Sequence, residues 1–197
     1  NFKFGSQRAR TGWFFSQDLS TDFADYEPTS QQQLFRFCAR DTGQELSRRF
    51  KVAISNIRPS QVADSIDPYG TFDVVLRRIE DRDEAVRIVE RYTKCNLNPN
   101  SSNYIARRIG TQYVQWDDTE RRHRVYGDWP NRSRFVRVVM NEDVDNAVTK
   151  RGLLPFGCKG PIRYKGFTLH SASIHNTSVA NGNGGQFLRS TSSYYRG

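Results

Sequence analysis

The chain has 197 residues, of which 36% are hydrophobic and 13% aromatic, and a net charge of +9. This length allows one domain with a substantial core or two small domains, and the aromatic content excludes disorder of the whole chain. No segment approaches the roughly 18 consecutive apolar residues of a membrane helix, and we expect no signal peptide at the start. The first residue is Asn1 rather than Met, which is compatible with a piece of a longer product.

The positive charge is concentrated near the end of the sequence. Residues 1–145 hold 23 basic and 21 acidic residues, a balance of +2, whereas residues 146–197 hold 7 basic residues and no Asp or Glu. Arginine outnumbers lysine 24 to 6, which favours planar, multi-donor contacts with carboxylates, carbonyls or phosphates. The basic end indicates a nucleic-acid contact, a surface that meets an acidic neighbour, or one half of a domain.

The three cysteines are Cys38, Cys95 and Cys158, which are far apart and odd in number. They cannot all pair within the chain, and no Cys-x-x-Cys motif is present to hold zinc or to exchange disulfides. A reducing compartment is the simpler interpretation.

The first part of the chain predicts an irregular segment followed by three strands. Residues 1–33 are polar with scattered aromatics, and only Trp13–Phe15 is expected to form a packed patch. Apolar side chains then alternate with polar ones, the pattern of strands with one buried face. The three predicted strands cover residues 34–40, 50–57 and 71–77.

The middle of the chain contains one ambiguous segment and one predicted helix. Residues 83–93 combine a helical stripe of apolar residues with β-branched residues that favour a strand. Residues 99–109 predict a helix, because Asn98 is suited to the N-cap, Pro99 to the first helical position and Gly110 to the position after the end. Ile105 and Ile109 are expected to form its buried stripe.

The remaining elements predict an α+β fold. Residues 112–116 and 122–126 predict a hairpin, and residues 135–140 predict a last strand. We therefore expect a mixed or antiparallel sheet packed with a few helices, followed by a β-rich or irregular C-terminal part. Three parts are predicted: a leading segment (1–33), an α+β core domain (34–145), and a basic continuation rich in Gly, Ser and Asn (146–197), which belongs to a second domain or is flexible.

Known catalytic and cofactor patterns do not match the sequence. The glycines at 182–185 fit neither phosphate-loop template, and His123, His170 and His175 lack metal-ligand spacing. The acidic groups Asp81–Glu84 and Asp117–Glu120 could supply paired carboxylates to a hydrolase, but Asp is also favoured at turns and helix starts. We expect no catalytic, cofactor-binding or metal-binding residues and no enzyme activity.

Residues 112–137 interleave arginines with aromatic residues. Single-strand nucleic-acid binders use aromatic rings on strands with flanking Arg, whereas protein interfaces are also rich in Arg, Tyr and Trp. The same stretch carries Asp117, Asp118, Glu120 and Asp128, which would repel phosphate. Protein contact is therefore favoured, and a nucleic-acid-binding module that uses this stretch and the basic C-terminal part is the alternative.

A series of short motifs runs through the middle of the chain. In chain order it consists of Tyr69–Phe72, the strand 73–77, Val89–Tyr92, Asn96–Ser101, Asn103–Gly110 and Gly127–Asn131. The most specific block is Asn96–Gly110, in which an Asn-Leu-Asn-Pro-Asn-Ser helix start is followed by Tyr-Ile and closed by Ile-Gly. This series resembles the tail sheath proteins of contractile bacteriophages. The resemblance covers about residues 69–131, a third of the chain, and departs from the usual spelling in having Asn98 where Asp is common.

The resemblance implies a structural role for the chain. Sheath subunits stack around a tail tube in the virion and contract on a signal from the baseplate, which drives the tube through the host envelope for genome ejection. The implied partners are other copies of the subunit, the tail tube and baseplate proteins, without cofactor or membrane insertion. The implied location is the phage tail, assembled in the host bacterial cytoplasm, and the chain would be a fragment of the full-length subunit, able to exist alone as a monomer.

Overall fold

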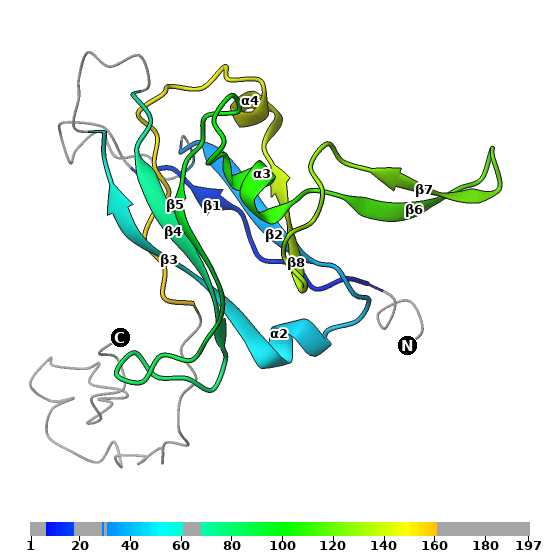
Figure 1. Cartoon of the computed structure of the whole chain (residues 1–197), viewed down its shortest axis with the longest axis horizontal. Helices are drawn as coiled ribbons and strands as arrows, with labels where there is room; N and C mark the ends of the chain where they lie inside the picture. The colour runs from blue at the N-terminus through cyan, green and yellow to red at the C-terminus, as the bar shows by residue number, and fades with distance from the viewer. Residues whose placement is uncertain (1–6, 18–28, 30, 61–67, 161–197) are drawn as a thin grey trace, which may run out of the picture. The chain divides into compact units, whose positions relative to one another are not determined.

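The computed structural model describes residues 7–17, 29, 31–60 and 68–160 (Figure 1). Within these residues, eight strands form small antiparallel sheets, and three short helices accompany them. The predicted α+β class is therefore confirmed. Contacts divide the chain into Asn1–Pro161 and Ile162–Gly197. The second unit, which includes most of the predicted basic continuation, lies outside the described residues.

The first sheet has the order β1-β2-β8 and is antiparallel throughout. Its strands are β1 (Phe14–Phe15), β2 (Gln33–Ala39) and β8 (Val136–Met140). Both β2 and β8 were predicted, because alternate residues along them face the core. Phe35, Phe37 and Val138 are fully or almost fully buried on that face. The aromatic patch at Trp13–Phe15 contributes β1, in which Phe14 lies opposite Phe35.

The second sheet has the order β3-β4-β5, with β3 (Phe50–Arg58), β4 (Thr71–Arg78) and β5 (Ile88–Cys95). The central strand β4 is buried on both faces, so that Asp73 and Arg77 are buried together with Phe72. The ambiguous segment at 83–93 becomes a turn followed by β5, and not a helix. Its backbone pairs with β4, where Val75 lies opposite Arg91, and these ladder contacts outweigh the helical pattern.

The hydrophobic core lies between the two sheets and around α3 (Ile105–Ile109). The rings of Phe35 on β2 and Phe72 on β4 stack with centroids 5.8 Å apart and an interplanar angle of 7°. Ile105 and Ile109 are fully buried, and α3 contacts both β5 and β8. The helix therefore links one sheet to the other (Figure 1).

The first half of the helix predicted over residues 99–109 is wrong. Only residues 105–109 are helical, and Tyr104 rather than Asn98 occupies the N-cap position. The backbone N–H of Asn96 donates to Asn103 (3.0 Å) and that of Ile105 donates to Asn96 (3.1 Å), so the intervening chain must fold back in turns. Asn98 serves one of these turns by accepting a hydrogen bond from the Asn100 N–H (3.0 Å). The predicted end is confirmed, since Gly110 follows the last helical residue with φ of +109°.

Two further short helices were not predicted. They are α2 (Glu45–Arg49), which leads directly into β3, and α4 (Glu142–Asp145), which follows β8. Asn141 caps α4 by accepting a hydrogen bond from the Asp143 N–H (3.0 Å). Helices of four or five residues contain too few positions to show a periodic pattern.

Residues 153–160, called the strap here, connect the two sheets. The Gln17 N–H, next to β1, donates to the Leu154 carbonyl (2.7 Å). Ile54 on β3 exchanges two backbone hydrogen bonds with Cys158, of 2.6 and 3.0 Å. Leu153, Leu154 and Pro155 are buried, so the strap completes one side of the core.

The hairpin of β6 (Tyr113–Asp117) and β7 (Arg122–Tyr126) confirms the predicted pair of strands. It extends away from both sheets (Figure 1), and most of its side chains are exposed. In the described part of the chain, no helix has the length and apolar character needed to cross a membrane.

Candidate interaction surface

Two of the sequence motifs, Asn96–Gly110 and Gly127–Asn131, lie directly against each other. The N–H groups of Thr111 and Gln112 donate to the Trp129 carbonyl, at 3.0 and 3.3 Å. The Trp129 N–H in turn donates to the Thr111 hydroxyl oxygen (3.1 Å). A side chain at Gly110 would collide with the Pro130 carbonyl oxygen, 2.7 Å from the position of a Cβ. We call this region, residues 90–92, 96–112 and 127–134, the motif junction.

Glu90 ties the Val89–Tyr92 motif to the same junction. One carboxylate oxygen accepts hydrogen bonds from the Ser133 hydroxyl (2.6 Å) and the Tyr92 hydroxyl (3.2 Å). The other accepts from the Arg134 N–H (3.0 Å). Burial, together with the neighbouring Glu90 charge, raises the pKa of Tyr92 to about 12. Glu90 thus acts as a connector between β5 and the loop before β8.

Tyr104, just before α3, and Arg107, within α3, complete the junction. The Tyr104 ring is fully buried, and its hydroxyl donates to the Asp145 carboxylate in α4 (2.7 Å). Burial, followed by the contact with Asp145, raises the pKa of Tyr104. The Arg107 guanidinium lies over the Trp129 ring, 4.2 Å from its centroid. The junction therefore supports the base of the hairpin through contacts from α3 and the loop before β8.

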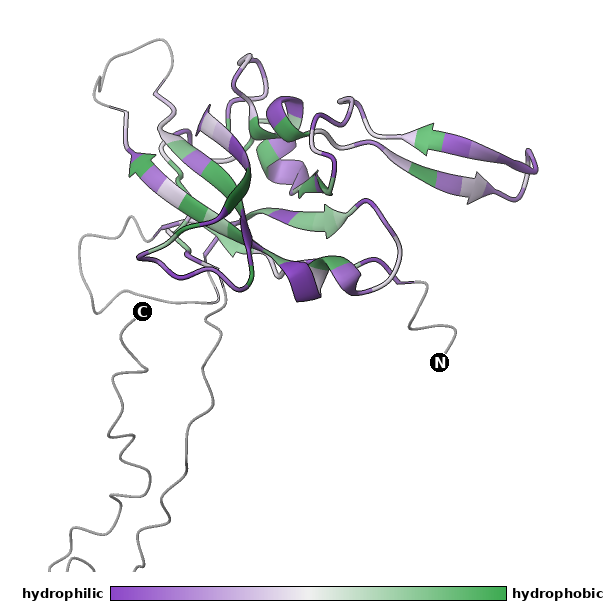
Figure 2. Ribbon diagram, turned by 60° about the horizontal axis from the view of Figure 1, so that its bottom comes forward, coloured by the Kyte–Doolittle hydropathy of each residue, from purple (hydrophilic) through white to green (hydrophobic). Residues whose placement is uncertain are grey.

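One face of the hairpin is apolar and exposed. Val114 lies opposite Val125, and Trp116 lies opposite His123. Val114 and Trp116 are each 48% exposed and Val125 is 58% exposed. Because side chains alternate between the faces of a strand, these four side chains share one side of the hairpin, called the apolar hairpin face here. Figure 2 shows hydrophobic residues on β6 and β7 outside the core.

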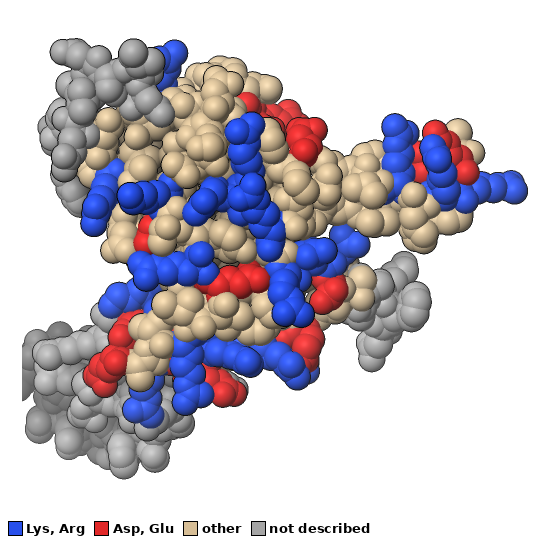
Figure 3. Space-filling view, in the orientation of Figure 1, with Lys and Arg blue, Asp and Glu red and all other residues tan. Residues whose placement is uncertain are grey.

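The opposite face of the hairpin is polar and aromatic. The rings of Tyr113 and Tyr126 stack with centroids 5.5 Å apart, close to the base. Toward the tip, Figure 3 shows basic and acidic side chains intermixed. Residues 113–126 contain three Asp or Glu and three Arg residues, so the hairpin has no net charge apart from His123.

An isolated two-stranded hairpin is at best marginally stable in water, and an exposed apolar face on such a hairpin fits contact with another protein.

A shallow hollow lies between the hairpin base and β8. Its volume is about 190 Å³, and Tyr113, Trp129 and Arg137 are among its lining residues. Pockets that enclose a small-molecule ligand typically measure about 300–1,000 Å³. The hollow is below that range, so its size gives no support for a cofactor site.

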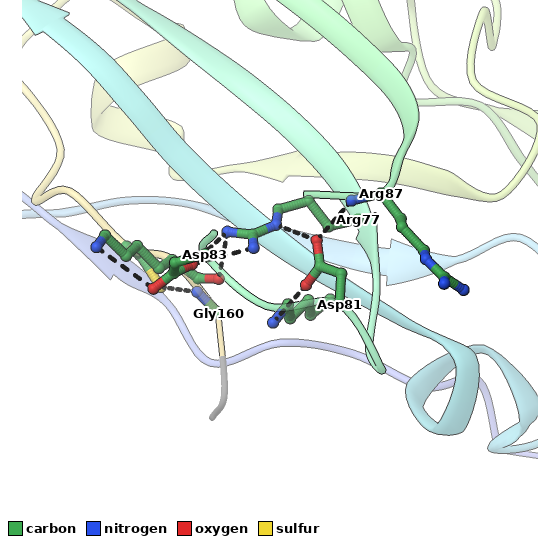
Figure 4. Close-up of polar contacts among 8 residues, drawn as sticks. Arg77, Asp81, Asp83, Arg87 and Gly160 are labelled. Carbon is green, nitrogen blue, oxygen red and sulfur yellow. Dashed lines mark hydrogen bonds and ion pairs between the residues drawn. The ribbon is translucent and has the colours of Figure 1, made fainter. Parts of the chain in front are cut away.

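Two residues of the acidic group Asp81–Glu84, the buried Asp81 and the exposed Asp83, belong to an ion-pair network (Figure 4). Asp81 contacts the Lys51 ammonium at 2.8 Å and the Arg77 guanidinium at 2.6 Å. Arg77 also contacts Asp83 at 3.0 Å, and Asp83 contacts Lys159 of the strap at 3.3 Å. These carboxylates hold β3, β4 and the strap together. The network could have been predicted from the sequence, because Lys51 and Arg77 are charged residues inside otherwise apolar strands.

The network lowers the pKa values of its carboxylates. Burial alone would raise the pKa of Asp81, but hydrogen bonds from Arg77, Lys51 and the Arg87 N–H outweigh it and hold the pKa below its ordinary value. Burial would likewise raise the pKa of Asp83, but contacts with Arg77 and Lys159 outweigh burial and lower that pKa. A general acid requires a raised pKa near the working pH, and these shifts go in the opposite direction.

The second acidic group, Asp117–Glu120, forms the hairpin turn. One Asp117 oxygen accepts hydrogen bonds from the N–H groups of Thr119 (2.9 Å) and Glu120 (3.2 Å). His123 packs edge-on against Trp116 with centroids 5.2 Å apart. The described residues contain no group of His, Cys, Asp and Glu suited to a metal ion. His170, His175 and the glycines at 182–185 lie outside the described residues.

Cys38 and Cys95 are buried thiols, and Cys158 is partly exposed; none of them forms a disulfide. Burial raises the pKa of the Cys95 thiol to about 12. A reactive cysteine needs a lowered pKa and access to solvent, so Cys95 is suited to packing.

The described residues thus form an α+β domain with an exposed hairpin whose base is hydrogen-bonded to the loop before β8. Comparison with known proteins finds no matching family model, no matching curated protein and no matching solved structure.

Proposed function

We propose that the chain is part of a structural subunit of a contractile phage tail sheath. The observation that carries the proposal is the ordered series of motifs between Tyr69 and Asn131. In this role, copies of the subunit polymerise around the tail tube, and contraction of the array drives the tube through the host envelope. The tube and the baseplate are the further partners, and the virion tail is the location.

The geometry of the motifs supports a structural role for them. Glu90, Gly110 and Trp129 lie far apart in sequence, yet all three belong to the motif junction. None of their contacts resembles a catalytic arrangement of nucleophile, base and orienting group. They instead hold an exposed hairpin at a defined place on the domain, as a protein-contact element requires.

The proposed mechanism stores energy in contacts between subunits. Contraction is then a rigid-body movement about interfaces and needs no nucleotide or cofactor. Rigid bodies require internal cross-links that survive the movement. The stacked core aromatics supply such links, as do the buried ion pairs of Asp81 with Lys51 and Arg77.

Electron microscopy of the intact gene product tests the proposal. Tubes or sheath-like polymers are expected, together with detection of the protein in purified virions by mass spectrometry. A gene product that stays monodisperse in every condition tried and is absent from virions would exclude a sheath role.

The alternative is a nucleic-acid-binding module that uses residues 112–137 and the basic C-terminal part. Three aromatic rings in residues 112–137 already carry a guanidinium over one face: Tyr113, Tyr126 and Trp129. This arrangement leaves less ring surface for base stacking. A titration with single-stranded DNA at two salt concentrations separates the alternatives, because phosphate contacts predict an affinity that falls steeply with salt.

A further inference from the structure

The outer face of the first sheet carries a group of arginines. Because Phe35 and Phe37 on β2 point into the core, the alternate residues Arg36 and Arg40 lie on the opposite face. Cys38, between them, lies opposite Arg137 on β8 and opposite Arg10 on the other side. We call the surface formed by these four arginines and the neighbouring Arg8 the basic face.

The basic face has no acidic counterpart in the described part of the chain. The arginines with a carboxylate within 4.0 Å there are Arg49, Arg77, Arg91, Arg122 and Arg124, none of which belongs to this face. The Nε atoms of Arg36 and Arg137 are buried without a hydrogen-bond partner among the described groups. A buried donor without a partner is costly and calls for an explanation, such as a water, an ion or a ligand.

The positive charges also act on one another. Burial lowers the pKa of Arg137, and the charges of Arg8 and Arg36 lower it further. Among the residues that the structure describes, one direct hydrogen bond holds the Arg8 guanidinium, a long one of 3.4 Å to the Val114 carbonyl. A carboxylate brought to this surface would therefore relieve repulsion and satisfy free donors at the same time.

Two of the guanidinium groups lie over aromatic rings. The Arg36 guanidinium lies over Trp13, 4.7 Å from the ring centroid, and that of Arg137 lies over Tyr113 at 4.3 Å. A contact of this kind restrains the position of the guanidinium. The N–H groups at the end of a guanidinium match the two oxygens of a carboxylate. The covered ring faces, in contrast, are not available to stack nucleic-acid bases.

We infer that the basic face is a docking surface for a carboxylate-rich segment of a polypeptide partner. Arg36 and Arg137 supply orientated forks, while Arg8, Arg10 and Arg40 supply further positive charge around them. The inference rests on the geometry of the first sheet and does not depend on the proposed sheath function.

The test measures binding of a fluorescent ten-residue glutamate peptide to the 197-residue chain by anisotropy. A glutamine peptide of the same length and a ten-nucleotide single-stranded DNA serve as competing probes. The glutamate peptide is expected to bind most tightly, with an affinity that falls as salt is raised. Equal binding of the glutamine peptide, or tighter binding of the DNA, would overturn the inference.

Variants locate the binding surface. The pair Arg36→Gln and Arg137→Gln is expected to weaken glutamate-peptide binding by more than about tenfold, since hydrogen bonds between charged groups contribute about 1.5–3 kcal/mol each. The matched control is Arg58→Gln with Arg151→Gln, two exposed arginines outside the face with the same change in net charge. Equal weakening by both pairs would show a net-charge effect and overturn the inference.

A third variant covers the case in which the first pair does not fold. Arg10→Gln changes an exposed residue of the face and is expected to weaken binding by about two- to fivefold, because an exposed ion pair contributes less than about 1 kcal/mol. Unchanged binding in this variant, when the first pair is unfolded, would also overturn the inference. Neither outcome bears on polymer formation, so a failure here is distinguishable from a failure of the sheath proposal.

Discussion

At the scale of single residues, backbone conformation and close packing together require glycine at position 110. The φ of +109° at Gly110 lies in the region that residues with a side chain rarely adopt. A Cβ there would also collide with Asn131 and with the Pro130 carbonyl oxygen. Gly110→Ala is expected to lower the free energy of unfolding by at least about 1 kcal/mol from the backbone strain alone, with more from the collision. Urea denaturation followed by circular dichroism measures the change.

Gly12 offers the matched control for this substitution. A Cβ at Gly12 would meet no atom within 4 Å, so Gly12→Ala is expected to change stability by less than about 0.5 kcal/mol. Equal stability of the two variants would show that the motif junction does not require glycine at position 110.

Asp81 is the residue on which the buried ion pairs converge. Asp81→Asn removes the charge that faces Lys51 and Arg77 while keeping the shape of the side chain. Breaking a buried pair from one side typically costs about 3–5 kcal/mol, because charges are left buried without a partner. The exposed pair of Glu45 and Arg49 gives the comparison: Glu45→Gln is expected to cost less than about 1 kcal/mol. Thermal melts of both variants at pH 7 decide whether the network is structural.

At the scale of elements, a substitution in the exposed hairpin is expected to reduce assembly while leaving the stability of the domain almost unchanged. Val125 is 58% exposed on the apolar hairpin face, so Val125→Thr is expected to change stability by less than about 0.5 kcal/mol. In the intact gene product, the same change is expected to reduce polymer formation, since it makes a proposed contact surface more polar. Sedimentation of polymers and a thermal melt measure the two effects.

The control for the hairpin is Val148→Thr, which makes the same chemical change at an exposed position outside the hairpin. Polymer formation reduced equally by both variants, or by neither, would argue against the apolar hairpin face as a contact surface.

The elements also differ in how far the sequence predicts them. Period-two alternation of apolar side chains is sufficient to predict β2, β3, β4 and β8, although β4 is buried on both faces. The first half of the helix predicted over 99–109 does not form, because the pairing of Asn96 with Tyr104 competes with helix formation there. Residues 83–93 could not be decided from periodicity, since only pairing with β4 selects the strand. The hairpin was predictable, but the contacts that hold its base were not.

At the scale of the whole molecule, the lowered pKa values predict loss of stability in acid. Burial opposes the shift in Asp73, Asp81 and Asp83, yet hydrogen bonds and cations lower the pKa of each below the ordinary 3.8. The unfolded chain therefore binds these protons at higher pH than the folded chain does. The stabilisation is complete above about pH 4 and is lost as the pH falls through the folded-state values. Urea midpoints measured from pH 7 to pH 2 follow this loss.

The same titration contains its own control. In Asp81→Asn the loss below pH 4 is expected to be shallower, because one of the linked groups no longer titrates. Stability that is constant or increases between pH 5 and pH 2 would contradict the assignment of charged carboxylates to this network.

The sequence by itself determined the α+β class, most of the strands, the hairpin and the motif series that suggests a sheath subunit. These features are local, since they depend on periodicity, turn residues and spacing. Only the tertiary structure decided that Gly110, Glu90 and Trp129 belong to one junction. It likewise decided that Lys51 and Arg77 neutralise Asp81, while Arg36 and Arg137 meet no carboxylate among the described residues. Such contacts depend on sheet pairing and burial, which the spacing of residues in a single sequence does not encode.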